Sequence, residues 1–234
     1  MKDIKLTDIL FYFAFVVVII IAVFFDKKYL AYALPVVILS IGIIYLQYID
    51  KINFWYILSL LTMIVCDVII YTDFVTNFGI ICLLTSVYFV ACTLALRKYI
   101  LIKDIKRKTF WTVPIVVSAA LICYLIYSIS QLLIDVVIEI IPQVTLCILS
   151  TTLYVLTAYL IYIHDRYKEG LKLIVVAFLC IFIVSLLPIN ELFYPNKIFT
   201  VFINIAHVLS LYIFMKFLIE THEEKVTTNK EKYL

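Results

Sequence analysis

The chain has 234 residues, of which 66% are hydrophobic and only 15% are charged. Soluble domains carry about 45–50% apolar and about 25% charged residues, so this composition, with a mean hydropathy of +1.15, excludes an ordinary soluble protein and predicts an integral membrane protein. The formal charge of +3 is too small to indicate nucleic-acid binding.

Eight apolar stretches are long enough to be membrane spans, because about 17–25 apolar residues cross a hydrocarbon layer roughly 30 Å thick. The first span follows a charged N-terminus without a small-residue cleavage site, so we interpret it as uncleaved. The breaks between spans are short, which makes sequential helices antiparallel neighbours. We expect one all-α domain over residues 1–219 and a polar cytoplasmic tail over 220–234. The predicted spans cover residues 8–25, 29–48, 53–71, 74–96, 110–130, 141–163, 171–188 and 198–219.

The joint at 131–140 is the least regular connection. Asp135 and Glu139 lie four residues apart in it and would therefore share one face of a helix. We expect an interfacial helical extension between the fifth and sixth spans.

Lysine and arginine predict the orientation of these spans. With the N-terminus inside, the inner segments hold 15 basic residues and the outer segments hold 3. This asymmetry follows the positive-inside rule and predicts eight spans with the N-terminus and C-terminus both inside. We expect a multi-pass protein of the bacterial cytoplasmic (inner) membrane.

Asp67 interrupts the third span, about four residues before its outer end. An acid at mid-membrane costs about 2.5–3.5 kcal/mol on insertion scales and less near the interface, so it is expected to face the bundle interior, a water pocket or a partner. Asp67 is therefore a candidate functional residue. The structural alternatives are that it reaches the outer headgroup layer or bonds to a neighbouring Ser or Thr.

His207 is the second candidate, in the eighth span. Asn204 and Ser210 lie three residues to either side of it, so the three share a helix face that we expect to point into the bundle, with Leu211 toward lipid. The imidazole could act as an acid, a base or a partner for Asp67. Alternatively, it could make only an interhelical hydrogen bond that contributes about 0.6 kcal/mol to packing. Counting helical rise from the span ends puts Asp67 roughly 6 Å deep and His207 roughly 13 Å deep, which leaves Asn204 as an alternative neighbour of Asp67.

We predict that the remaining polar residues within the spans serve helix packing rather than catalysis or ligand binding. Hydroxyls such as those of Ser150, Thr151, Thr152 and Ser86 can bond back to their own helix. The six cysteines lie in apolar segments without metal-ligand spacing and are interpreted as small buried hydrophobes. We predict no metal and no cofactor.

Two spans carry a resemblance to a known family. The third span, "LLTMIVCDVII", looks like an apolar run ending in Gly-Asp, with Asp67 retained and Cys66 at the glycine position. The eighth, "INIAHVLSLY", looks like an Ala-Gln segment, with Ala206 matched and His207 at the glutamine position. The family is the YhhN family of eight-span membrane proteins, which includes the lysoplasmalogenases.

Two further spans support the same resemblance. The second span keeps a proline at Pro35, with Leu34 where the family has lysine. The seventh, "FLCIFIVSLLPINELF", is similar to a Phe-x-x-Ser-Asp segment, with Ser185 retained and Leu186 at the aspartate position. In the fourth span the family has a histidine, and Val87 stands near that position in this sequence.

The resemblance implies hydrolysis of the vinyl ether bond of a lysoplasmalogen-type lipid. It makes Asp67 and His207 the candidate catalytic residues, and Ser185, Asn204 and Ser210 candidate substrate-binding residues in an outward pocket of spans three, seven and eight. Membrane lipids and a lysophospholipid substrate are the expected partners. The alternative is a non-catalytic lipid-binding, sensor or assembly protein of the same fold. A transporter is less favoured, because Gly/Pro-interrupted helix pairs are missing.

Overall fold

The computed structural model describes residues 6–100, 140–163 and 167–231. These residues form seven helices that are long and apolar enough to cross a membrane, and they contain no strand, so the predicted all-α class is confirmed. Three single turns, η1 (Lys27–Tyr29), η2 (Arg97–Tyr99) and η6 (Ile189–Phe193), join or extend the long helices. The long helices are α1 (Leu6–Phe24), α2 (Leu30–Tyr48), α3 (Phe54–Thr72), α4 (Phe78–Leu96), α6 (Ile141–Ile163), α7 (Gly170–Pro188) and α8 (Lys197–Glu231).

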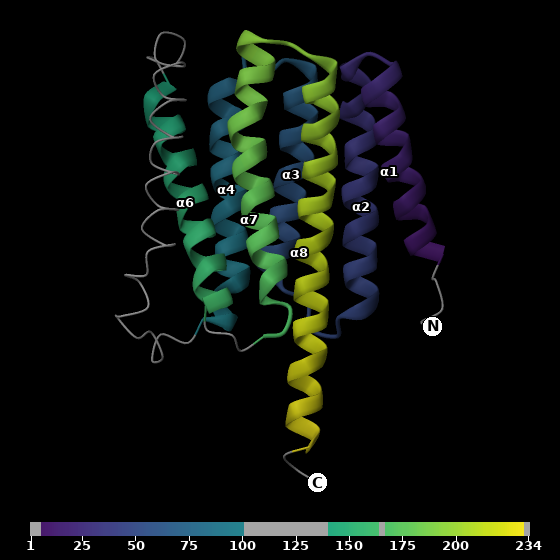
Figure 1. Ribbon diagram of the computed structural model, residues 1–234, viewed down its shortest axis with the longest axis vertical. Helices are drawn as coiled ribbons and strands as arrows, with labels where there is room; N and C mark the ends of the chain where they lie inside the picture. The colour runs from purple at the N-terminus through teal and green to yellow at the C-terminus, as the bar shows by residue number, and fades with distance from the viewer. Residues whose placement is uncertain (1–5, 101–139, 164–166, 232–234) are drawn as a thin grey trace.

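Seven of the eight predicted spans correspond to these helices, and their ends agree within a few residues except at the end of α8, which continues to Glu231. The predicted span 110–130 lies outside the described residues, as does the joint at 131–140 except for its last residue. In Figure 1, α4 ends and α6 begins at opposite ends of the bundle, while α1 begins and α8 ends at the same end. The eighth span and its orientation stay predictions.

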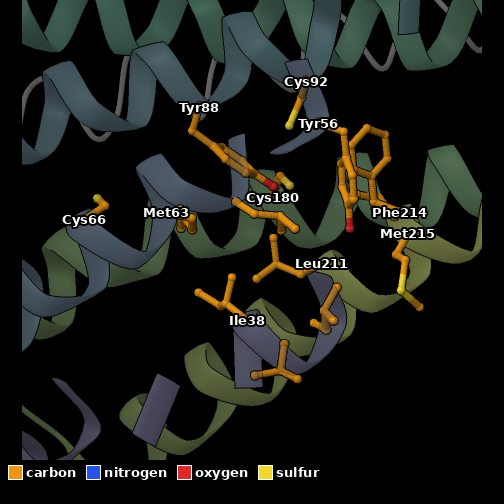
Figure 2. Packing of buried hydrophobic residues seen from close by; sticks show 14 of the residues in the cluster. Ile38, Tyr56, Met63, Cys66, Tyr88, Cys92, Cys180, Leu211, Phe214 and Met215 are labelled. Atoms are coloured by element: carbon orange, nitrogen blue, oxygen red, sulfur yellow. The ribbon is translucent and has the colours of Figure 1, made fainter. Parts of the chain in front are cut away.

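Helix α8 lies among several others, because it packs against α7, α1 and α2 and its side chains also reach α3. The remaining neighbours follow chain order, with α4 against α6. Buried aromatic rings meet near one end of the α3–α8 interface. The Tyr56 and Phe214 ring centroids lie 5.7 Å apart, and the Tyr154 centroid lies 6.1 Å from that of Phe214. Figure 2 shows Tyr56 and Phe214 among the buried residues.

The outward faces of the bundle are apolar. Phe13 on α1, Leu149 on α6 and Phe178 on α7 are 68%, 62% and 67% exposed. Such apolar surface is stable against lipid tails rather than water. The structure therefore supports a multi-pass membrane protein whose outer surface contacts lipid.

The ends of α7 and α8 differ from the predicted breaks. The segment after Pro188 falls in the predicted break between the seventh and eighth spans, yet it continues as the π-helical turn η6, closed by the Tyr194 N–H donating to the Ile189 carbonyl at 2.9 Å. Helix α8 continues through the predicted polar tail to Glu231, because the tail contains no glycine or proline that would end it.

The predicted orientation can be tested with reporter fusions. Fusions after Asp73 should report outside and fusions after Lys103 should report inside, because the basic segment 97–108 is expected to stay in the cytoplasm. Paired alkaline phosphatase and fluorescent protein reporters give opposite signals at each position. The reverse pattern would contradict the predicted topology.

Candidate functional site

Asp67 and His207 are in direct contact, although 140 positions separate them in the sequence. The His207 Nε2 lies 3.0 Å from the Asp67 Oδ2, and the two side chains are only 7% and 3% exposed. This distance is that of a hydrogen bond, and which of the two groups donates depends on the tautomer of His207 and on which group carries the proton. The two candidate catalytic residues are thus brought together between α3 and α8.

A second polar contact lies one helical turn beyond this pair. The Tyr71 hydroxyl donates to the Asn204 Oδ1 at 3.0 Å, and both residues are buried. Tyr71 follows Asp67 by four residues and Asn204 precedes His207 by three, so the antiparallel helices α3 and α8 place both pairs on the same faces. We call Asp67, His207, Tyr71 and Asn204 the α3–α8 polar cluster.

The alternative that Asn204 is the neighbour of Asp67 is wrong. Depth counting assumed that both helices end at one level. Helix α3 continues five residues past Asp67, whereas α8 begins ten residues before His207. At 1.5 Å per residue, α8 therefore starts roughly 7 Å beyond the end of α3, which brings His207 level with Asp67.

Polar contacts continue from the cluster toward the end where α7 meets α8. The Asn204 Nδ2 donates to the Thr200 carbonyl at 2.7 Å, and the Asn190 Nδ2 donates to the Thr200 Oγ1 at 3.2 Å. The Asn190 Oδ1 in turn accepts from the Asn196 backbone N–H at 2.9 Å. The π-helical turn of η6 holds Asn190 against the first turn of α8.

An ion pair between Lys27 and Glu191 lies beside Asn190 at this end of the bundle. The Asn190 Nδ2 also donates to the Glu191 Oε1 at 3.1 Å, and the other Glu191 oxygen pairs with the Lys27 ammonium. Lys28 pairs instead with Asp26, whose carboxylate accepts from the Lys28 N–H, and this hydrogen bond lowers the pKa of the Asp26 carboxyl. Lys27, half exposed, therefore links η1 to the buried side of η6.

The predicted substrate-binding residues behave differently from one another. Asn204 belongs to the cluster. Ser210 is buried, but its hydroxyl donates to the His207 carbonyl at 2.8 Å, so it serves its own helix. Ser185 is half-buried on α7 and makes no side-chain hydrogen bond within the described residues.

The inward direction of the polar face of α8 is confirmed, because Asn204, His207 and Ser210 are all buried. The expectation that Leu211 faces lipid is wrong, since it is 1% exposed. The reason is that α8 has neighbours on several sides and so buries apolar positions as well as polar ones. Phe202, 55% exposed, lies on the outward face instead.

Other polar side chains in the spans follow the expected packing pattern. The hydroxyls of Ser150, Thr151 and Thr152 donate to backbone carbonyls three or four residues earlier, as does that of Ser86. The five cysteines of the described segments are free and buried. Among the same residues, no three His, Cys, Asp or Glu side chains are grouped as a metal site.

Sequence reasoning missed Tyr71, Asn190, Thr200 and the Lys27–Glu191 ion pair. For Tyr71 a signal was present, since it lies one turn after Asp67 on the same helix face. Asn190 and Glu191 stand in a segment that resembles a loop, so nothing in the sequence indicated their burial.

Comparisons of the chain with protein-family models, with curated proteins and with solved structures found no match.

Proposed function

We propose that the protein is a YhhN-type membrane hydrolase that cleaves the vinyl ether bond of single-chain, lysoplasmalogen-type lipids. The supporting observation is the buried contact between Asp67 and His207. A carboxylate and an imidazole within an apolar bundle carry a solvation cost, and such groups in membrane spans are typically functional. We further propose that the protein works in the bacterial cytoplasmic membrane with the N-terminus and C-terminus inside.

In the proposed reaction His207 is the proton carrier and Asp67 is the group that orients it. The Asp67 carboxylate accepts the Nε2–H and stabilises the imidazolium, which leaves Nδ1 as the working nitrogen. The division of roles is that of the Ser-His-Asp triad, in which the aspartate holds Nδ1–H and Nε2 transfers the proton. An imidazole exchanges protons readily near neutral pH, so one group can serve as both acid and base.

The bond changes balance with one water molecule. The His207 Nδ1–H protonates the alkene carbon β to the ether oxygen, and the electron pair of the double bond forms the new C–H bond. Water adds to the resulting oxocarbenium carbon and returns its proton to Nδ1. The His207 Nδ1–H then protonates the glycerol oxygen as the C–O bond to the glycerol breaks and the C=O bond forms, and Nδ1 takes up the hemiacetal hydroxyl proton, which yields a fatty aldehyde and a glycerophospho-base.

The direct test uses the purified full-length protein in detergent micelles. With a lysoplasmalogen it should release aldehyde and glycerophospho-base in equal amounts. The saturated alkyl-ether analogue is the matched control, because it has no double bond to protonate and should release nothing. A wild-type protein that produces no aldehyde would contradict the hydrolase proposal.

A second candidate is a lipid sensor, and the length of α8 favours it. The helix that carries His207 runs as one 35-residue element and extends well beyond the bundle at its far end (Figure 1). A shift of α8 on binding at the polar cluster would then move its extension. Lipid binding without aldehyde release, together with a label at the end of α8 that moves on binding, would favour the sensor.

A further inference from the structure

The polar contacts between α3, α8 and η6 form a row that leads from the Asp67–His207 pair to one end of the bundle. In order, the row consists of the Asp67–His207 pair, the Tyr71–Asn204 pair, Thr200, Asn190 and the Glu191–Lys27 ion pair. Tyr71 follows Asp67 by four residues on α3 and Asn204 precedes His207 by three on α8, so the first two pairs of the row lie one helical turn apart.

The exposed fraction of the side chains increases along this row toward Lys27. Asp67, Asn204 and Asn190 are 1–2% exposed. The Glu191 side chain is 3% exposed and its partner Lys27 is 48% exposed. The row therefore reaches water at Lys27.

On the other side of the Asp67–His207 pair, most of the side chains on the same helix faces are apolar, and the polar residue there, Ser210, donates its hydroxyl to the His207 carbonyl of its own helix. One turn away stand Met63 on α3 and Leu211 on α8, 8% and 1% exposed. Beyond them the Tyr56 and Phe214 rings are in edge-to-face contact, and Figure 2 shows Met63, Leu211, Tyr56 and Phe214 within one packed group. Among the described residues, this side of the pair therefore offers water few hydrogen-bond partners.

We propose that this row is the route by which water and protons reach the Asp67–His207 pair, and that the pair exchanges only with the end of the bundle at Lys27 and Glu191. The amides of Asn190 and Asn204 carry both donors and acceptors, so water and protons would pass along the row by exchanging with the hydrogen bonds that these amides make. Asn190 and Thr200 are positioning residues of this route. The inference does not depend on the hydrolase proposal, because it concerns the pair without substrate.

The test measures hydrogen–deuterium exchange at the imidazole C2 carbon of His207 by mass spectrometry of the full-length protein in D2O. This exchange requires a protonated ring and a solvent base, so it reports the access of water and protons together. His164 and His222 are reference imidazoles in the same digest. The rates are compared across pH, so that a change in access is separated from a change in titration.

Asn190→Leu and Thr200→Val should each slow the His207 exchange severalfold at every pH, because both place apolar groups in the row. Thr200→Val keeps the shape of the side chain and serves where Asn190→Leu disturbs folding. Gln47→Leu is the matched control at the opposite end, where Gln47 accepts from the Thr7 hydroxyl, and it should leave the rate unchanged. Unchanged exchange in Thr200→Val, or equal slowing by Gln47→Leu, would overturn the proposed route.

Discussion

Replacing Asp67 by asparagine is expected to lower the rate of aldehyde release by about 10²–10⁴-fold, the range typical of a lost acid–base function. The amide keeps the size of the carboxylate, and its oxygen can still accept the Nε2–H. It carries no charge, however, and cannot stabilise the His207 imidazolium. Because Asp67 contacts His207 rather than the lipid in this proposal, the loss should fall on kcat while KM changes little.

Two further variants make this kinetic result specific. Asp73→Asn is a matched control near the end of α3, where the Asp73 carboxylate accepts from the Thr76 N–H in an exposed position, and it should retain full activity. His207→Gln keeps a hydrogen-bonding side chain but removes the titrating ring, so it should be as inactive as Asp67→Asn. An active His207→Gln variant would show that the imidazole is not the proton carrier, and a fully active Asp67→Asn variant would exclude a charged role for Asp67.

Much of the fold was predictable because lipid is a simple solvent. Apolar length alone predicted the seven described helices, and the cost of polar groups in hydrocarbon singled out Asp67 and His207. Both signals act within one segment and need no knowledge of its neighbours. The pairing of Asp67 with His207 was a hypothesis only, because nothing within one span specifies how far its neighbour is shifted along the axis.

The predictions that were wrong also depended on how neighbouring helices are placed. The depth estimate failed because α8 begins farther out than α3 ends, and Leu211 was misplaced because α8 has neighbours on several sides. The segment at Asn190 resembled a loop by composition, yet side-chain bonds to Thr200 and Asn196 hold it as a π-helical turn. Such bonds join residues of different elements, so they become visible only once the helices are placed.

The free energy of unfolding should show whether Asp67 and His207 form a charged pair or a neutral packing contact. The variants are Asp67→Leu, His207→Leu and the double variant, measured by equilibrium unfolding in one detergent or bicelle mixture. Interhelical hydrogen bonds in membrane proteins contribute about 0.6 kcal/mol on average. Removing one partner of a buried ion pair costs about 3–5 kcal/mol, because the other charge is left uncompensated, while replacing both partners is often neutral or stabilising.

For a charged pair, His207→Leu should therefore destabilise the protein by about 3 kcal/mol or more, and the double variant should be more stable than His207→Leu alone. Ser150→Ala is the control, because the Ser150 hydroxyl bonds only to its own helix at the Cys147 carbonyl, and its loss should be small. A coupling near 0.6 kcal/mol, with additive single variants, would mean a neutral contact. That result would remove the stabilised imidazolium on which the proposed proton transfer depends, whatever the lipid.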